Sequence, residues 1–291
     1  MAKISIIIPT WKRDEIFSET IHAALHAINN IDAEIIVIND FPEKAIHIDN
    51  EKVTVVNNIG RGVTVARNYG AKLANAELVL FIDNDIIVSE ENIRKTLALH
   101  AHQKSIIANC IWVYPDSILN KINDSSFGRT LVGWKLGSFK DRYEAFNGKW
   151  DEHIFQAKYP FAAFYFSVEK KDYLATGGFN ENIIVGGEEV EFSDGLKKIG
   201  VRYIIDPENI VLHNEKDRTF DYREWLKRTA LAYQQKEKLT SVKQPFSIFY
   251  VLGFMESVLY KIIDNIPNKR NYDKTYARVL SFLKNIIIQK V

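Results

Sequence analysis

The sequence predicts an α/β fold in which helices cover both faces of a mostly parallel central sheet. Short apolar runs rich in β-branched residues are typical of fully buried strands. Such runs lie at residues 4–8, 34–38, 53–56 and 78–82, and segments with helical spacing separate them. Buried strands that alternate with helices indicate a parallel sheet with both faces covered.

The individual elements follow from their sequence and from the residues at their ends. Pro9 should stop the first strand, because proline cannot donate a hydrogen bond to a sheet. Gly200 should end the last helix of this part, with Lys197 and Lys198 in its final turn. Residues 112–159 are aromatic and lack clear periodicity, so we expect loops and short elements around a site. The expected helices lie at 16–29, 63–74, 170–176 and 188–199, and a shorter strand at 161–168.

Composition indicates an ordinary globular protein of 291 residues. Hydrophobic residues make up 46% and charged residues 26% of the chain, so disorder is not expected. The formal net charge of +1 gives no reason to expect nucleic-acid binding. Cys110 is the single cysteine, which excludes an intrachain disulfide and a zinc site built from cysteines. The start of the chain does not resemble a secretory signal, and we therefore expect a cytoplasmic protein.

The net charge changes sign along the chain. From Lys216 to the C-terminus, 15 Lys and Arg residues outnumber 7 Asp and Glu, giving a local net charge of +8. The residues before Lys216 carry a net charge of −7. Such a change is typical of a boundary between parts of a chain. We therefore predict a main domain over residues 1–215 and a C-terminal helical extension over residues 216–291.

Two carboxylates follow the buried strand at 78–82. Asp83 and Asp85 are separated by Asn84, and alternation along an extended chain would point both carboxylates to one side. Open α/β sheets bind ligands at the carboxyl ends of their strands. Oxygen ligands with open coordination positions suit Mg²⁺ or Mn²⁺ bound through a diphosphate. A solvated turn after a strand would have the same residues.

Two other strands end in polar or aromatic residues that should reach the same edge of the sheet. Trp11 could stack on a base, and Asp40 could accept a hydrogen bond from a ring N–H. Arg67 lies on a predicted helix, where it could meet anionic groups. Taken singly, these residues also fit a packed tryptophan, a helix cap and a surface charge.

An acidic helix start follows the pair Gly186-Gly187. Glu188, Glu189 and Glu191 lie in its first turn, where the helix dipole stabilises carboxylates. Three acids in four residues exceed what a helix cap needs. A carboxylate at this place could take a proton from an acceptor hydroxyl.

Taken in order, these motifs give residues 4–215 a specific resemblance to the family 2 glycosyltransferases, which have the nucleotide-sugar fold called GT-A. The motifs are Ser5-Ile6-Ile7-Ile8-Pro9-Thr10-Trp11, Val37-Ile38-Asn39-Asp40, Ala66-Arg67-Asn68-Tyr69-Gly70, Phe81-Ile82-Asp83-Asn84-Asp85, Gly177-Gly178-Phe179-Asn180-Glu181 and Gly186-Gly187-Glu188-Glu189-Val190-Glu191-Phe192.

The resemblance implies a role for each matching residue. A Mn²⁺ or Mg²⁺ ion would be held by the Asp-x-Asp motif, with Asp85 the more direct ligand and Asp83 beside it, and by the downstream His213. Glu189 would be the catalytic base, with Glu188 beside it. The nucleotide of the donor would be bound by Pro9, Thr10, Trp11, Asp40, Arg67, Asp83 and Asn84. The acceptor or the donor sugar would be contacted by Gly178, Phe179, Gly187 and Glu191.

The sequence departs from the family pattern at two positions. Glu189 stands where the family usually has an aspartate, and Asp40 is followed by Phe41-Pro42 where a second aspartate is common.

The implied activity is an inverting transfer of a sugar from a nucleotide diphosphate, UDP first among them, to a hydroxyl. The acceptor would be a glycan or a lipid-linked glycan, as in cell-surface polysaccharide biosynthesis. Two alternatives remain open. A sugar-phosphate nucleotidyltransferase shares the nucleotide-binding topology, but such an enzyme should have a Gly-rich loop after its first strand, and no glycine directly follows the first strand here. A non-catalytic nucleotide-sugar or glycan-binding module is the other.

The segment 245–263 is apolar and aromatic, but Glu256 and Lys261 interrupt it. Its length is marginal for a transmembrane helix, which is not expected. Three alternatives remain: a helix packed on the main domain, an interfacial segment on an anionic membrane surface helped by nearby basic residues, and an oligomer interface. The second would attach the protein peripherally to the inner face of the cytoplasmic membrane. The oligomeric state stays open.

Overall fold

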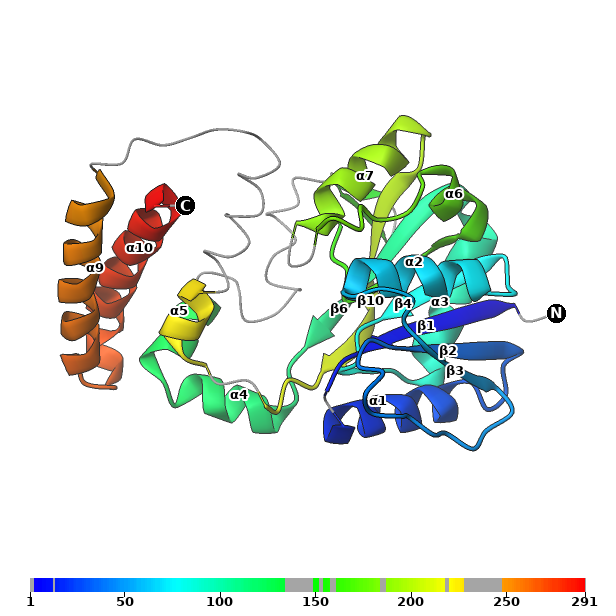
Figure 1. The fold of residues 1–291 in the computed structure, drawn as a ribbon, viewed down its shortest axis with the longest axis horizontal. Helices are drawn as coiled ribbons and strands as arrows, with labels where there is room; N and C mark the ends of the chain where they lie inside the picture. The colour runs from blue at the N-terminus through cyan, green and yellow to red at the C-terminus, as the bar shows by residue number, and fades with distance from the viewer. Residues whose placement is uncertain are drawn as a thin grey trace. The chain divides into compact units, whose positions relative to one another are not determined.

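The computed structural model describes residues 3–12, 14–133, 149–151, 154–157, 161–183, 187–217, 220–227 and 248–290. Contacts between Cα atoms divide the chain into two compact units (Figure 1). The first unit comprises residues 1–115 and 138–216, and the second comprises residues 116–137 and 217–291. Two helices within residues 116–133 therefore belong to the second unit, together with the C-terminal helices.

A mixed sheet forms the centre of the first unit. Its strand order in the described residues is β3-β2-β1-β4-β9-β6-β10-β8-β7, and β5 pairs with β10. Strands β3, β2, β1 and β4 run parallel, whereas β9 is antiparallel to both of its neighbours. The strands are β1 (Ile4–Thr10), β2 (Ala33–Asn39), β3 (Val53–Asn57), β4 (Leu78–Ile82), β5 (Ile86–Ile87), β6 (Ile106–Val113), β7 (Lys149–Asp151), β8 (Ile154–Ala157), β9 (Tyr165–Glu169) and β10 (Arg202–His213).

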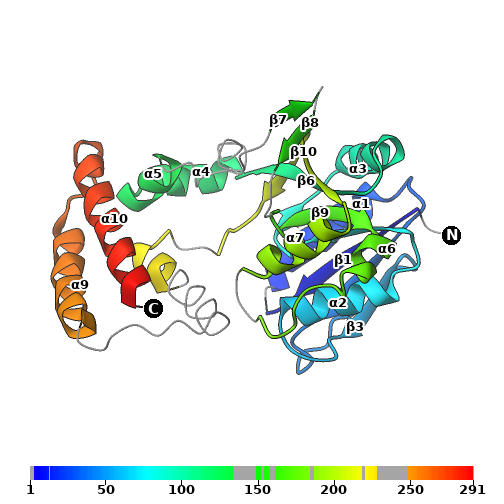
Figure 2. The same cartoon turned by 90° about the horizontal axis from the view of Figure 1, so that it is seen from above.

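Helices cover both faces of this sheet, as predicted. On one face α1 packs against α3, and on the other α2 packs against β1, β2 and α6. Figure 2 shows α2 and α3 on opposite sides of the sheet. The predicted α/β fold is therefore confirmed. The helices of this unit are α1 (Asp14–Ala27), α2 (Val63–Leu73), α3 (Glu90–His102), α6 (Lys170–Ala175) and α7 (Glu188–Lys198).

The first strand continues beyond Pro9, where we expected it to stop. The Thr10 carbonyl accepts a hydrogen bond from the Asp40 amide, so Thr10 faces β2. Pro9, one residue earlier, faces the opposite side, where the pairing of β1 with β4 has already ended at Ile7. The missing N–H of Pro9 therefore breaks no ladder hydrogen bond, and the strand extends to Thr10.

Helix α3 and strands β5, β6 and β10 lie outside the elements predicted. Ser89 caps α3 through a capping box with Asn92. The register of β10 against β6 shifts between Asp206 and Ile210, and this irregularity accommodates Pro207 within the strand. Strand β9 begins at Tyr165, so the strand predicted at 161–168 starts four residues late.

The second unit is helical in the residues described. An ion pair joins α5 to α10 through Arg129 and Asp273, with Nε 2.7 Å from Oδ2. None of the described helices is both long enough and apolar enough to cross a membrane. The helices are α4 (Asp116–Asn123), α5 (Ser126–Gly133), α9 (Ile248–Asn265), the 3-10 helix η2 (Arg270–Tyr272) and α10 (Asp273–Lys290). The core of the unit is formed by Phe127, Leu131, Tyr222, Leu226, Ile263, Tyr276, Leu280 and Leu283.

Candidate active site

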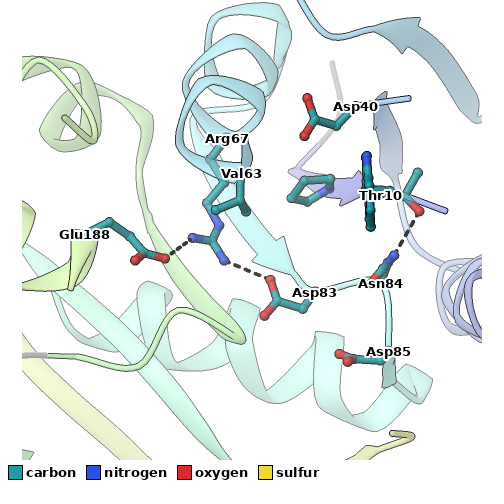
Figure 3. A pocket seen from close by; sticks show the side chains of 10 residues that line it. Thr10, Asp40, Val63, Arg67, Asp83, Asn84, Asp85 and Glu188 are labelled. Atoms are coloured by element: carbon teal, nitrogen blue, oxygen red, sulfur yellow. Dashed lines mark hydrogen bonds and ion pairs between the residues drawn. The ribbon is translucent and has the colours of Figure 1, made fainter. Parts of the chain in front are cut away.

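A cavity of about 350 Å³ opens at the carboxyl ends of β1, β2 and β4 (Figure 3). The structure gathers there every residue predicted to bind the donor nucleotide, together with Asp85 and Glu188. Only Val63 among the lining residues was not predicted. The lining residues are Pro9, Thr10, Trp11, Asp40, Val63, Arg67, Asp83, Asn84, Asp85 and Glu188.

Asp40 anchors the loop that leads into α2. Its Oδ1 accepts a hydrogen bond from Asn58 Nδ2 at 2.7 Å, and its Oδ2 accepts one from the Gly62 amide at 3.0 Å. Gly62 precedes α2 with φ of 96°, a conformation that favours glycine. Asp40 therefore helps to set the start of the helix that carries Arg67. Its carboxylate keeps acceptor capacity for a ligand, since a carboxylate has about four acceptor sites.

Trp11 lines the pocket with an exposed aromatic side chain, 54% of whose surface is accessible. Its ring meets Phe41 edge to face with centroids 6.4 Å apart. The ammonium of Lys12 lies over both rings, 4.8 Å from the Trp11 centroid and 4.1 Å from that of Phe41. The exposed indole leaves a surface on which a planar base can stack.

Arg67 is the buried centre of the site. Its Nη2 donates to Asp83 Oδ1 at 2.8 Å and to the Ala163 carbonyl at 3.1 Å, and its Nη1 donates to Glu188 Oε1 at 3.2 Å. Burial lowers the pKa of Arg67, but Asp83 and Glu188 more than offset this and raise it overall. A permanently charged guanidinium thus joins the end of β4 to the start of α7.

Residues 83–85 form a turn, not the extended segment on which the sequence prediction relied. The Ile86 amide donates to the Asp83 carbonyl at 3.1 Å, and Asn84 Nδ2 donates to Thr10 Oγ1 at 2.9 Å. Thr20 holds the turn from α1 by donating to the Asn84 carbonyl. Both carboxylates still line the pocket. The turn gives them different partners, since Asp83 meets Arg67 and Asp85 meets a histidine.

That histidine is His213, at the end of β10. Its Nε2 lies 3.3 Å from Asp85 Oδ1 and 3.8 Å from Glu215 Oε1. One potential ligand atom from each of the three residues falls within 4.8 Å of the others. Although burial lowers the pKa of His213, Asp85 raises it overall. Glu215 was missed from the sequence, yet the spacing of His213 and Glu215 is the same as that of Asp83 and Asp85.

The three side chains fit a divalent cation. Carboxylates and an imidazole are ligands that Mn²⁺ accepts, and two carboxylates also suit Mg²⁺. The Nδ1 atom of His213 is buried and has no hydrogen-bond partner in the part of the chain described here. The predicted pair of Asp85 and His213 is therefore brought together, whereas Asp83 is engaged by Arg67.

Glu188 and Glu189 differ in their surroundings at the start of α7. Glu188 is buried and paired with Arg67. Glu189 is partly buried and is not among the residues that line the cavity. Burial, followed by the negative charge of Glu188, raises the pKa of Glu189 from 4.5 to about 7. Gly187 begins the helix with φ of 85°.

The remaining predicted sugar contacts lie around the 177–183 turn. Asn68 accepts hydrogen bonds from the Phe179 amide and from Tyr173 Oη, and donates to the Phe179 carbonyl. Gly178 packs so closely on Asn68 that a Cβ atom there would lie 2.3 Å from Oδ1. Phe179 is 2% exposed and sits in an aromatic cluster behind Arg67, so its ring has no free surface to offer a sugar. Glu191 accepts a hydrogen bond from Asn180 Nδ2 at 2.8 Å, which ties α7 to this turn.

The sheet, the pocket at its parallel edge and the paired carboxylates define a GT-A glycosyltransferase fold. The chain belongs to glycosyl transferase family 2, whose model matches residues 5–171. The predicted family and fold are thereby confirmed.

Two curated relatives are validoxylamine A glucosyltransferases. The one from Streptomyces hygroscopicus subsp. limoneus is 23% identical over 250 residues, covering 75% of this chain and 53% of that protein. The one from Streptomyces hygroscopicus subsp. jinggangensis is 22% identical, covering 75% and 57%. The chain therefore spans about half the length of the curated relatives it matches.

Two solved structures share the fold. The mannosyltransferase PcManGT of Pyrobaculum calidifontis, solved with GDP-Man and Mn²⁺, superposes with a TM-score of 0.57 at 13% identity, covering 99% of this chain and 87% of that one. GalNAc-T7, solved with UDP, GalNAc and Mn²⁺, superposes with a TM-score of 0.53 at 16% identity, covering 73% of this chain and 43% of that one.

Proposed function

We propose that this protein transfers a sugar from a nucleotide diphosphate to a hydroxyl group, with inversion at the anomeric carbon. The observation that carries the proposal is the pocket in which Arg67, Asp83 and Asp85 meet an exposed tryptophan at the carboxyl ends of three parallel strands. A UDP-sugar is the proposed donor, and a glycan or lipid-linked glycan the proposed acceptor. The Mn²⁺ and nucleotides bound by the two structural neighbours support this assignment.

Different residues of the pocket would bind different parts of the donor. Trp11 offers a stacking surface for the base, and the oxygens of Asp40 can accept a hydrogen bond from a ring N–H. Asp85 and His213 would hold Mn²⁺ or Mg²⁺, which when bound neutralises charge on the departing diphosphate. Arg67 holds Asp83 and Glu188 in the wall of the pocket that would receive the diphosphate and the sugar.

Glu189 is the proposed catalytic base. The ion pair with Arg67 occupies Glu188, whereas no basic side chain is recorded within ion-pair distance of Glu189 in the described part of the chain. A pKa of about 7 suits a group that accepts a proton near neutral pH. In a single displacement, Glu189 takes the proton of the acceptor hydroxyl as the hydroxyl oxygen bonds to the anomeric carbon and the bond to the diphosphate breaks.

A product analysis tests the proposal. The purified chain is incubated with a panel of nucleotide sugars and Mn²⁺, and the released phosphate species are identified. Release of nucleoside diphosphate supports sugar transfer, whereas release of inorganic diphosphate would indicate a nucleotidyltransferase. Tight binding of a nucleotide sugar without turnover on any acceptor would indicate a binding module. Asp85→Ala should abolish release while leaving the far-UV circular dichroism unchanged.

We also propose that the second unit attaches the protein to an anionic membrane surface. Three apolar side chains at helical spacing on α9 are exposed: Phe254 (73%), Val258 (40%) and Ile262 (45%). Val258 and Ile262 line an apolar groove of about 610 Å³ that Lys261 also borders. An apolar stripe beside cations complements a layer of acyl chains below anionic headgroups.

Vesicle flotation tests this attachment with the full chain. Vesicles with anionic lipid should bind the protein at low salt, and binding should weaken at high salt because screening shortens the range of the attraction. Phe254→Ser should reduce binding more than Phe282→Ser, a matched change at another exposed phenylalanine, on α10. Absence of binding at low salt, or dimerisation that hides the groove, would refute the proposal.

A further inference from the structure

We propose that Glu215 is a third protein ligand of the cation held by Asp85 and His213, so that this protein binds free Mn²⁺ before any nucleotide arrives. The proposal extends the proposed function, because it concerns the same cation site. It differs from a site built on two aspartates alone, which would depend on the diphosphate to complete the coordination shell.

The spacing of the three side chains suits one ion. Ligand atoms about 2.1 Å from a small divalent cation lie about 3 Å apart at neighbouring octahedral positions. His213 Nε2 is 3.3 Å from Asp85 Oδ1 and 3.8 Å from Glu215 Oε1. Small side-chain movements would therefore bring all three ligands onto one ion and leave its other positions open for diphosphate oxygens.

The surrounding backbone holds these ligands in place without a cation. His213 pairs with Ile86 across β10 and β5, and the Asn214 amide donates to the Asp85 carbonyl at 2.7 Å. The segment that carries Asp85 is therefore fixed to the segment that carries His213 and Glu215. Such preorganisation lowers the cost of binding a cation.

Aromatic side chains orient the two ligands that come from the end of β10. Tyr114 Oη donates to Glu215 Oε2 at 3.0 Å, which leaves Oε1 as the oxygen nearer His213. Trp112 meets the imidazole edge to face and Tyr114 stacks on it, with centroids 4.9 Å and 5.9 Å away. Tyr114 is thus a positioning residue for Glu215.

The ion pair of Asp83 with Arg67 favours a ligand from elsewhere in the chain. Arg67 binds Asp83 Oδ1 at 2.8 Å, so a buried guanidinium already engages one oxygen of this carboxylate. Glu215 supplies the second full negative charge at the site. The combination of imidazole with two carboxylates should favour Mn²⁺ over Mg²⁺, since imidazole nitrogen suits the softer ion better.

Isothermal titration with MnCl₂, without nucleotide, tests the proposal. Glu215→Gln should weaken Mn²⁺ binding by more than about 100-fold and Tyr114→Phe by about tenfold, because partners of a ligand contribute less than the ligand itself. Glu208→Gln is the matched control, since it removes the same charge from an exposed position on β10, the strand that leads to Glu215. It should leave the affinity unchanged.

Water-proton relaxation separates a ligand from a positioning role. Loss of a protein ligand frees a coordination position, so Mn²⁺ bound to Glu215→Gln at saturating metal should carry an additional exchangeable water. Wild-type Mn²⁺ affinity and hydration in Glu215→Gln would overturn the proposal. So would a wild-type protein that binds Mn²⁺ only with nucleotide. Sugar transfer by the wild type in either case would show that the proposed function survives the failure of this inference.

Discussion

Glu189→Gln should change stability and turnover in opposite directions. Burial and the charge of Glu188 raise the pKa of Glu189 from 4.5 to about 7 in the folded protein. Because the folded state holds this proton more tightly than the unfolded state, ionisation of Glu189 destabilises the fold. The penalty is absent below about pH 4.5, grows as the pH rises to about 7 and is constant above it.

The size of the effect follows from the pKa. A tenfold change in proton affinity corresponds to about 1.4 kcal/mol, so a carboxyl moved from 4.5 to about 7 destabilises the fold by up to about 3 kcal/mol at pH 8. Partial exposure of the side chain screens part of this, and we expect about 1–3 kcal/mol. Glutamine has nearly the same shape and no charge. Glu189→Gln should therefore be more stable than wild type by this amount at pH 8 and equally stable at pH 4.5.

Urea unfolding at pH 4.5 and pH 8 measures the difference, with EDTA present so that no cation contributes. Glu189→Gln should be more stable than wild type only at pH 8. Turnover of the same variant should fall by about 10²–10⁴-fold, the usual contribution of a general base. Wild-type kcat/KM should rise with pH through about 7, because the base acts in its ionised form.

Glu191→Gln is the matched control on the same helix, where an exposed carboxylate bonds Asn180. It should show no gain in stability that depends on pH. A stability difference for Glu189→Gln that is equal at both pH values would refute the electrostatic reasoning. Near-normal turnover would show that Glu189 is not the base.

Three further substitutions test the framework of the site. Arg67→Lys should reduce the free energy of unfolding by about 2–3 kcal/mol and weaken donor binding in titration calorimetry, since one ammonium cannot pair with Asp83 and Glu188 together. Unchanged stability and donor affinity would mean that these ion pairs are dispensable. Asp40→Ala should destabilise the protein by about 1–3 kcal/mol in urea, because the Gly62 amide loses its acceptor. Gly187→Ala should cost about 1–2 kcal/mol, because φ of 85° disfavours a side chain; a stability equal to wild type would show that the helix start relaxes freely.

The meeting of these residues in one pocket could be predicted from the sequence, because it depends on apolar strand patterns and on a general rule for parallel sheets. Apolar runs located β1, β2 and β4, and parallel strands bring their carboxyl ends to one edge of a sheet. Thr10, Asp40 and Asp83 therefore had to meet, whatever their separation in the chain. The same reasoning could have reached β6, since residues 106–113 are almost entirely apolar.

The partners within the pocket were not predictable from local signals. Arg67 resembles a surface charge in sequence, and its burial depends on Ala163 and Glu188, which follow about a hundred residues later. Strand β10 contains Pro207, which argues against a central strand. Because the bulge that tolerates this proline is visible only in three dimensions, the place of Glu215 beside Asp85 could not be foreseen.

Burial and the charge balance around Arg67 together explain why Glu189 keeps its proton to a higher pH than an ordinary glutamate. Asp83 and Glu188 both approach this one guanidinium, so the group already carries more negative than positive charge. Burial disfavours the ionised form of Glu189, the negative charge of Glu188 adds to this effect, and Glu189 therefore holds its proton until about pH 7. The sequence could separate Glu188 from Glu189 only by their 100° offset on a helix. The structure separates them by their partners: Glu188 is paired with Arg67, whereas Glu189 has no ion pair among the residues described and has the proton affinity that a base needs at neutral pH.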